Sequence, residues 1–399
     1  MTAHSLKTPR TLLIPAMLDA HFPLLRWAFE SASYHAVVLD QEDGISDVGL
    51  RNTHNDMCYP CVLITGQVIT ALRSGRYDPT RTVVMLPQAG DACRGSNYLH
   101  VLRRSLDTAG FSRVALLSLN VLGIDREIGL PITVTMIRRA LAAVIFGDEL
   151  MLLKNQTEPF EAVPGSAEAL RQRWLFRLAE SLRRNSGLSA RATKHTCREI
   201  AADFKTLSRV DRPVQPVAIV GELYIKYCHL GNWNLEQYLR EKGCQVCVNG
   251  FSWYVLYYMD THLAEGPLWE RLGFRLLMRY VSSVQRQMIS TMLRVGFTAL
   301  PPFQAFKAAS AGFVPFSCTI GDGWLITAEL AAWAQAGCKK AVCAQPFGCL
   351  PSHVCGRGLY ASLQRKLNNM QLVSVDFDAS GSDVMVKSRI QMLLDNREP

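Results

Sequence analysis

Short apolar stretches alternate with helix-like stretches along the first third of the chain. The apolar stretches are too short for buried helices, and the segments between them carry apolar residues at helical spacing. Strands that recur about every 20 to 35 residues, with a helix between successive strands, are typical of a parallel sheet covered by helices. The pattern predicts strands at 12–14, 36–39, 82–86 and 114–119, and helices at 22–33, 61–73 and 98–109.

A helical segment separates this region from a second alternating region. Apolar and basic residues recur at helical spacing through 132–207, and Pro213 lies in a linker-like stretch at 208–216. The pattern then predicts strands at 217–221, 244–248, 340–344 and 372–377, and helices at 235–242, 269–294, 359–367 and 383–394. We therefore predict an α/β fold class with two doubly wound parallel-sheet domains, at 1–131 and 208–399, and a helical insertion at 132–207.

The composition is that of a globular protein with enough apolar material for sizeable cores. The 399 residues are 49% hydrophobic and 19% charged, which argues against a disordered chain. No apolar run reaches about 18 residues, so we expect no membrane-spanning helix and no membrane partner. Residues 1–10 are polar and lack the apolar core of a secretion signal, so we expect a cytoplasmic protein.

A basic stretch contributes much of the net charge of +9. On a helix, these residues would form a solvated face, or a surface for an acidic partner or an anionic substrate tail such as the phosphates of coenzyme A. No nucleic-acid motif accompanies the stretch, so we expect no DNA or RNA partner. The residues are Arg171, Arg173, Arg177, Arg183, Arg184, Arg191, Lys194 and Arg198.

Three of the twelve cysteines, Cys58, Cys93 and Cys349, lie in turn-like settings, each before a helix-like stretch. In a cytoplasmic chain of this length, so many cysteines indicate metal binding, redox chemistry or burial rather than a disulfide scaffold. Thiolates are soft ligands, and helix N-termini offset the negative charge of a thiolate-bound cluster. The arrangement therefore favours an iron–sulfur cluster.

The predicted topology brings these three cysteines toward one cleft. Cys93 follows the strand at 82–86, Cys349 follows the strand at 340–344, and Cys58 begins the helix that ends near Gly75. Open parallel sheets bind their ligands beyond the carboxyl ends of the strands. A cluster held by two cysteines of the first domain and one of the second would therefore lie in the interdomain cleft, where small substrates commonly bind.

Six runs of residues, spread in order over nearly the whole chain, resemble the 2-hydroxyacyl-CoA dehydratase superfamily. The closer resemblance is to the dehydratase-like module of large proteins that also carry an activator ATPase, and some relatives are double-cubane cluster proteins. The runs are Asn55-Asp56-Met57-Cys58-Tyr59-Pro60, Cys93-Arg94-Gly95-Ser96-Asn97-Tyr98, Gly147-Asp148, Val220-Gly221-Glu222, Gly321-Asp322-Gly323-Trp324-Leu325 and Gln345-Pro346-Phe347-Gly348-Cys349-Leu350-Pro351-Ser352-His353.

This resemblance implies two flavodoxin-like domains with an oxygen-sensitive [4Fe-4S] cluster between them. It maps the cluster ligands onto Cys58, Cys93 and Cys349, and three thiolates leave one iron open to a substrate. It also implies a low-potential electron from a separate ATP-hydrolysing activator protein. The substrate would be an acyl-CoA or another small molecule, altered by radical dehydration or reduction in an anaerobic metabolism.

Two parts of that reaction system are missing from the sequence. The chain has no Gly-x4-Gly-Lys-Ser/Thr loop, so a partner would have to hydrolyse the ATP. Dehydratases of the family pair two different subunits, whereas this chain resembles only one of them. We therefore expect a homodimer or a second dehydratase-like subunit.

Four polar residues near the cysteines are candidates for supporting roles. Glu222 ends a strand and would serve as a general base in the cleft or as a helix cap. His353 would donate a proton beside the cluster or cap its own loop. Arg94 is placed to hydrogen-bond a cluster sulfur, and Ser96 to supply an oxygen ligand or donor. By contrast, we assign five aromatic residues to the core: Trp253, Tyr254, Tyr257, Tyr258 and Trp324.

Other cysteines leave three alternatives open. Cys58 and Cys61 form a Cys-x-x-Cys, but the order of elements around it is not that of a thioredoxin fold, and burial in a helix also explains Cys61. Cys244 and Cys247 would complete a four-thiolate zinc site with Cys58 and Cys61. However, Cys244 and Cys247 are three positions apart on a strand, which puts their side chains on opposite faces. Cys61, Cys343 and Cys355 would extend the three cluster cysteines to six, enough for a double-cubane [8Fe-9S] cluster.

The leading functional hypothesis is thus an iron–sulfur lyase or oxidoreductase of the dehydratase type. One rival is a non-catalytic iron–sulfur carrier or scaffold, and a double-cubane reductase of small molecules is another. A third is a cluster-free α/β binding module whose cysteines are simply buried.

Overall fold

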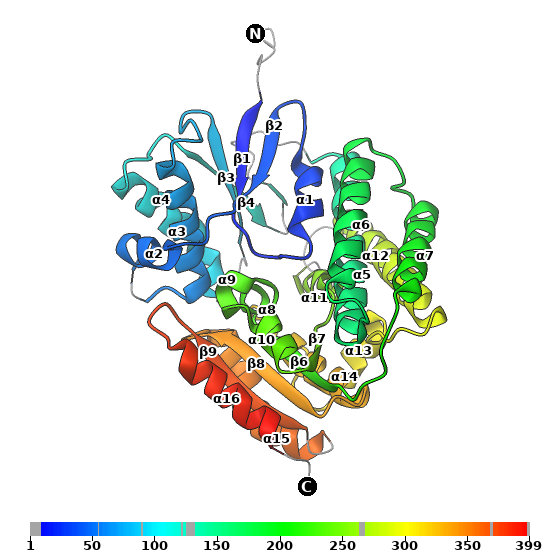
Figure 1. Cartoon of the computed structure of the whole chain (residues 1–399). Helices are drawn as coiled ribbons and strands as arrows, with labels where there is room; N and C mark the ends of the chain where they lie inside the picture. Colours follow the sequence, from blue (N-terminus) through cyan, green and yellow to red (C-terminus); the bar gives the residue numbers. More distant parts are fainter. Residues whose placement is uncertain are drawn as a thin grey trace.

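The computed structural model describes residues 9–54, 56–88, 91–120, 123–124, 132–262, 268–367 and 370–396. Asn55, three positions before Cys58, and Gly90, three positions before Cys93, lie outside the described residues. Two sheets form the frame of the molecule, with short helices between them and a body of long helices along one side (Figure 1).

The first sheet has the strand order β2-β1-β3-β4-β5. Its first four strands are parallel, and the short β5 runs antiparallel to β4. Buried apolar residues fill these strands because helices cover both faces of the sheet. The strands are β1 (Arg10–Ile14), β2 (Tyr34–Val38), β3 (Thr82–Pro87), β4 (Ala115–Asn120) and β5 (Gly123–Ile124).

Helix α1 (Phe22–Phe29) lies on one face of this sheet, and α2 (Ile45–Asn52), α3 (Tyr59–Arg73) and α4 (Tyr98–Thr108) lie on the other (Figure 1). A 3₁₀ turn at Arg94–Asn97 leads into α4. The α2 and α3 backbones approach so closely that a Cβ at Gly66 would lie 1.8 Å from the carbonyl oxygen of Ile45. Sequence analysis did not predict α2.

The helical body consists of α5 (Val134–Thr157), α6 (Ser166–Arg183), α7 (Ala190–Thr206), α11 (Phe251–His262) and α12 (Leu268–Arg294). A 3₁₀ turn at Glu158–Phe160 follows α5. Helix α5 contacts α1, α6, α7, α11 and α12, and its middle, from Ala142 to Leu153, is buried on every side. The body therefore extends beyond the predicted insertion at 132–207, because two helices from later in the chain pack against it.

The second sheet has the order β7-β6-β8-β9, and its four strands are parallel. Helices α15 and α16 pack along β9, at the lower left of Figure 1. We call the first sheet with α1–α4 the first lobe, and the second sheet with its helices the second lobe. Helix α9 of the second lobe contacts α3 of the first. The strands are β6 (Gln215–Gly221), β7 (Cys244–Cys247), β8 (Lys340–Pro346) and β9 (Gln371–Phe377). The helices are α8 (Leu223–Tyr227), α9 (His229–Asn232), α10 (Leu235–Glu241), α13 (Phe303–Ala309), α14 (Leu325–Gln335), a π-helical turn at Ser352–Arg357, α15 (Gly358–Lys366) and α16 (Asp383–Asp395).

The predicted fold class is confirmed: the chain is an α/β protein with two parallel sheets and added helices. The predicted bounds differ most at α1, which ends at Phe29 rather than at 33. The Ser31 hydroxyl accepts hydrogen bonds from the amides of Ser33 and Tyr34, so a turn replaces the last predicted helical turn.

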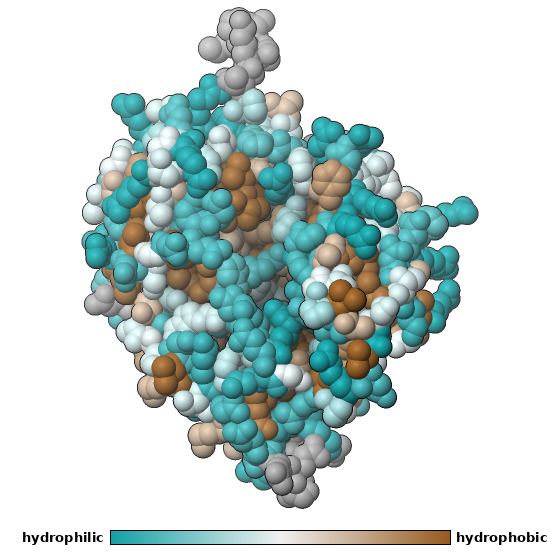
Figure 2. Space-filling view, viewed as in Figure 1, coloured by the Kyte–Doolittle hydropathy of each residue, from teal (hydrophilic) through white to brown (hydrophobic). Residues whose placement is uncertain are grey.

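The surface features match two expectations from the sequence. In the described part of the chain, no helix has the length and apolarity needed to span a membrane. The face in Figure 2 is mostly hydrophilic, with apolar residues in separate groups. The arginines of the basic stretch are exposed along α6 and α7, apart from the half-buried Arg171, and several pair with acids of their own helix, as in a solvated face.

Candidate functional site

A cavity of about 500 Å³ lies where the carboxyl ends of the strands of both sheets meet. Its wall includes Ile14 at the end of β1, Pro87 at the end of β3 and Pro346 at the end of β8. Cys58, Cys93 and Cys349 all line this cavity. The structure therefore brings the three cysteines together from three separate segments, in the interdomain position that the sequence indicated.

Cys58 lies at the N-cap of α3, and Pro60 follows in the first turn of the helix. Its sulfur is 2.8 Å from the hydroxyl of Tyr98, which is the first residue of α4. Burial raises the pKa of the Cys58 thiol, and the hydrogen bond with Tyr98 partly opposes that rise. Without a metal, Cys58 is thus a neutral thiol held between two helix N-termini.

Cys93 lies at the N-cap of the 3₁₀ turn, and the amide of Gly95 donates to its sulfur at 3.4 Å. The loop before it is fixed by Asp91, whose carboxylate accepts from the Cys93 amide at 2.7 Å. Ser96 closes the loop: its hydroxyl donates to the Asp91 carbonyl and accepts from the Asp91 amide. Burial raises the pKa of the Cys93 thiol to about 12.

Cys349 follows β8 in a turn in which Gly348 has a φ of +69°, in the left-handed region that favours glycine. The Cys349 carbonyl accepts hydrogen bonds from the His353 amide at 3.0 Å and from its Nδ1 at 2.8 Å. Burial raises the pKa of the Cys349 thiol, and the nearby Glu222 raises it further. All three cysteines therefore directly precede helical residues, as predicted.

Two acids line the same cavity, Glu222 and Asp322. Glu222 caps α8 by accepting from the Ile225 amide at 2.9 Å, and Asp322 is buried. Burial raises the pKa of both carboxyl groups, and the charge of Glu222 raises the pKa of Asp322 further. Among the described residues that line the cavity, Arg26 is the one basic side chain. The environment of the cavity thus shifts both acids and all three thiols toward their protonated forms.

A buried ion pair lies behind these acids. The Lys226 ammonium group donates to the Glu329 carboxylate and, at 3.0 Å, to the Asn249 side chain. Both charged residues are fully buried. The positive charge of Lys226 lowers the pKa of Glu222 and of Asp322, which opposes part of the effect of burial. This ion pair therefore moderates the proton affinity of the cavity acids from outside the cavity wall.

Helix α11 supplies an aromatic wall through Phe251, Tyr254 and Tyr258. The prediction that all five aromatic residues are core residues is wrong for Tyr254 and Tyr258, which face the cavity, whereas Trp253, Tyr257 and Trp324 are fully buried. Helical spacing accounts for the difference, because positions 251, 254 and 258 share one face of α11.

Asp148 fixes the start of α11. Its carboxylate accepts from the amides of Phe251 at 2.5 Å and Ser252 at 3.0 Å, and from His21 Nε2 at 2.8 Å. Asp148 lies in α5, and His21 precedes α1. One buried carboxylate therefore connects the first lobe, the helical body and the aromatic wall.

Three of the predicted supporting residues lie outside the cavity wall. Arg94 is exposed, Ser96 is used in closing the Cys93 loop, and His353 bonds to the Cys349 carbonyl. Glu222 lies in the wall, together with three residues that sequence analysis did not select: Asp322, Tyr98 and Tyr254. Asp322 and Tyr98 each lie within one of the resemblance runs, a signal that could have singled them out.

The other cysteines considered in the sequence lie apart from the cavity wall. Cys61 is buried within α3, Cys343 within β8 and Cys355 in the π-helical turn, and none of them lines the cavity. In the described part of the chain, Cys58, Cys61, Cys244 and Cys247 form no compact ligand group for a single ion, so the four-thiolate zinc alternative has no counterpart there.

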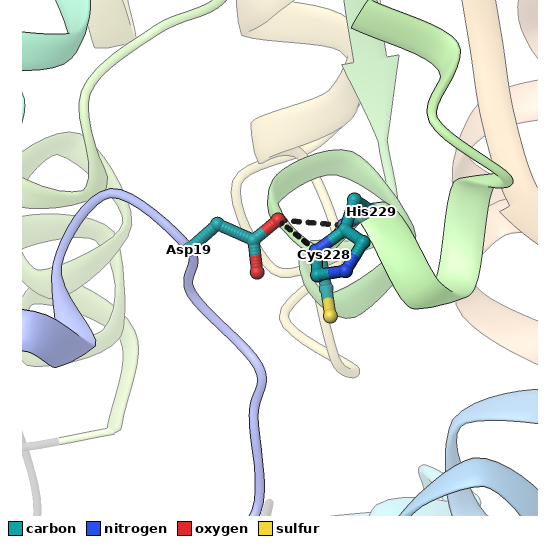
Figure 3. A group of neighbouring side chains, drawn as sticks. All are labelled: Asp19, Cys228 and His229. Atoms are coloured by element: carbon teal, nitrogen blue, oxygen red, sulfur yellow. Dashed lines mark hydrogen bonds and ion pairs between the residues drawn. The ribbon is translucent and has the colours of Figure 1, made fainter. Parts of the chain in front are cut away.

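One compact group of potential ligands for a single ion occurs among the described residues. It consists of Asp19, Cys228 and His229, whose ligand atoms lie within 4.8 Å of one another. Figure 3 shows the Asp19 carboxylate reaching from its loop to the turn that carries the other two residues. Asp19 accepts from the amide and from Nδ1 of His229, both at 2.7 Å, and the carboxylate of Glu42 lies 3.3 Å from His229 Nε2. Both nitrogens of the His229 ring therefore face carboxylates, which makes this group an ion pair between the lobes.

The three cavity thiols do not form such a compact single-ion group. All three are free cysteines, so no disulfide competes for them. Their soft donor atoms and the helix N-termini beside them suit an iron–sulfur cluster. No protein-family model matches the chain, and no similar curated protein was found.

Proposed function

We propose that the chain is a cytoplasmic iron–sulfur protein of the 2-hydroxyacyl-CoA dehydratase type. Cys58, Cys93 and Cys349 would hold a [4Fe-4S] cluster, and an ATP-hydrolysing activator protein would deliver a low-potential electron to it. A small-molecule or acyl-CoA substrate would then react by dehydration or reduction in a homodimer or with a second dehydratase-like subunit. The observation that carries the proposal is the meeting of these three cysteines at one interdomain cavity.

The electrostatics of the cavity support a positively charged occupant. Burial raises the pKa of all three thiols, and the cavity wall offers Arg26 as its basic side chain. Iron ions would supply the positive charge that stabilises the thiolates, so loading of the cluster displaces protons. The cluster, when bound, would supply one-electron chemistry and an open iron as a Lewis acid.

The protein's own side chains would handle the substrate and its protons. The aromatic wall of α11 and the apolar ends of the strands exclude water and hold the apolar part of a substrate. Because their pKa values are raised, Glu222 and Asp322 suit donation of a proton to a leaving hydroxide. Sequence analysis left two roles open for Glu222, a general base or a helix cap; Glu222 does cap α8, and the upward shift of its pKa favours donating a proton over accepting one.

The content of iron and acid-labile sulfide after strictly anaerobic purification tests the proposal. About four irons per chain, with a matching reduced-state spectrum, are expected for one cubane. About eight irons would replace it with the double-cubane reductase. A folded chain without iron would overturn the proposal and leave the cluster-free binding module. If the chain does hold a cluster, substrate-dependent changes in its electron paramagnetic resonance spectrum would separate an enzyme from a carrier or scaffold.

A further inference from the structure

A second thiol pair lies just outside the cavity. Cys318 lies in the segment between α13 and α14, and Cys355 lies in the π-helical turn that follows Cys349. Their side chains form a hydrogen bond with each other, and both are free thiols. Neither residue lines the cavity.

One helix holds both cysteines by their backbones. The Cys318 carbonyl accepts from the amide of Trp324 at 2.9 Å, immediately before α14. The Cys355 carbonyl accepts from the hydroxyl of Thr327, in the first turn of α14, at 3.2 Å. The two sulfur atoms thus meet because the same helix start anchors the segments that carry them.

Exposure separates this pair from a second hydrogen-bonded pair, Cys247 and Cys338. Both members of that second pair are buried, with 6% and 4% of their surface exposed. Cys355 is also buried, but Cys318 is partly exposed. A small oxidant in solution therefore reaches Cys318, whereas it is kept from the other pair.

The segments that carry the pair also form part of the cavity wall. Gly321 and Asp322 follow Cys318, and Pro351 precedes Cys355, and all three of these residues line the cavity. The segments are in close contact, since a Cβ at Gly321 would lie 2.6 Å from Cγ of Pro351. A covalent bond between Cys318 and Cys355 would therefore tie together two sides of the wall next to Cys349.

We propose that Cys318 and Cys355 are a redox-sensitive pair that a small-molecule disulfide, such as oxidised glutathione, converts into an intrachain disulfide. The Cys318 thiolate attacks one sulfur of the oxidant, which forms a mixed disulfide and releases one glutathione thiolate. The Cys355 thiolate then attacks the Cys318 sulfur and releases the second. The protons of the two cysteines pass through water to the two glutathiones, so the protein loses two electrons and the oxidant gains them.

The second step requires the thiolate of Cys355. Burial raises the pKa of Cys355 to about 12, so little of it is thiolate at neutral pH. The rate of disulfide formation is therefore expected to rise with pH. The reaction does not depend on whether the cavity holds a cluster, so its test is separate from that of the proposed function.

Peptide mapping of the whole chain tests the proposal. The reduced protein is incubated with oxidised glutathione under anaerobic conditions, its free thiols are alkylated, and it is digested with trypsin without reduction. The sequence predicts a linkage between peptides 308–339 and 341–357. Because these peptides also contain Cys338, Cys343 and Cys349, three variants identify the bond. The linked species is expected to persist in Cys338→Ser and to fall at least about tenfold in Cys318→Ser and in Cys355→Ser.

Two results would overturn the proposal. One is a linked species that survives in Cys318→Ser, because the bond would then involve Cys338. The other is a wild-type protein in which Cys318 keeps glutathione while Cys355 is alkylated. The wild-type map is informative by itself, even if a variant folds poorly.

Discussion

The carboxylate of Asp91 accepts a hydrogen bond from the amide of Gly321 at 2.6 Å, although 230 positions separate the two residues. The other oxygen of the same carboxylate accepts from the amide of Cys93. Gly321 has a φ of +54°, which favours glycine. One side chain therefore aligns the Cys93 loop of the first lobe with the cavity wall of the second.

Asp91→Ala is expected to lower both stability and iron content. It removes a charged acceptor shared by two amides, which is expected to cost about 3 kcal/mol in the free energy of unfolding. Denaturant unfolding and iron per chain are the measurements. Asp107→Ala serves as the control, because it removes an exposed i,i+4 partner of Arg103 and should cost less than about 1 kcal/mol. Equal effects of the two variants would contradict the proposed alignment.

Each of three single variants is expected to abolish normal cluster loading: Cys58→Ala, Cys93→Ala and Cys349→Ala. These thiols line the cavity, whereas Cys228 and Cys318 do not, so Cys228→Ala and Cys318→Ala should keep the wild-type iron content. Iron and sulfide per chain after anaerobic purification give the result. Full iron in all three single variants would refute the ligand assignment.

Lys226→Met is expected to destabilise the protein by about 3 to 5 kcal/mol, since it leaves the Glu329 carboxylate buried without its cation. The double variant Lys226→Met with Glu329→Leu should recover much of that loss, because no unpaired charge remains. Urea unfolding of the three proteins measures the effect. The exposed Lys387, paired with Asp383, is the control, and its Met variant should change stability by less than about 1 kcal/mol. A double variant as unstable as the single one would argue against this account.

The His229 ion pair predicts a pH dependence of stability. Hydrogen bonding to Asp19, with a further contribution from Glu42, raises the His229 pKa to about 9, against an ordinary value near 6.5. Because the folded-state pKa is the higher one, the stabilisation is complete below about pH 6.5 and is lost as the pH rises toward about 9. The melting temperature of His229→Gln should therefore fall less over this window than that of the wild type. His195→Gln, at an exposed histidine, should keep the wild-type slope.

Much of the fold could be predicted from local pattern. Strands buried on both faces are continuous apolar runs, and that signal, with the turns between the runs, located the predicted strands. Helix α2 escaped prediction because it is short and carries Gly49, and because it depends on close packing against Gly66 of α3. That contact is tertiary, so no window of sequence contains it.

Only part of the site could be predicted from the sequence, because the rest also depends on tertiary contacts. The settings of Cys58, Cys93 and Cys349 are local, and turn residues before a helix-like pattern pointed to each of them. Asp322 lies 100 positions after Glu222, and only the fold puts both acids in one wall. Tyr254 and Tyr258 belong to a helix that is apolar on most sides, so periodicity did not separate its cavity face from its core face.

The position of Asp148 has a consequence for how the protein melts. Its buried carboxylate, in α5, serves His21 before α1 and the amides that open α11. Separation of the first lobe from the helical body would therefore leave this carboxylate without its histidine partner, and separation of α11 would leave two amides unsatisfied. The first lobe and the helical body should consequently unfold in a single calorimetric transition, and a fragment that ends before α5 should not persist as an independent folded unit.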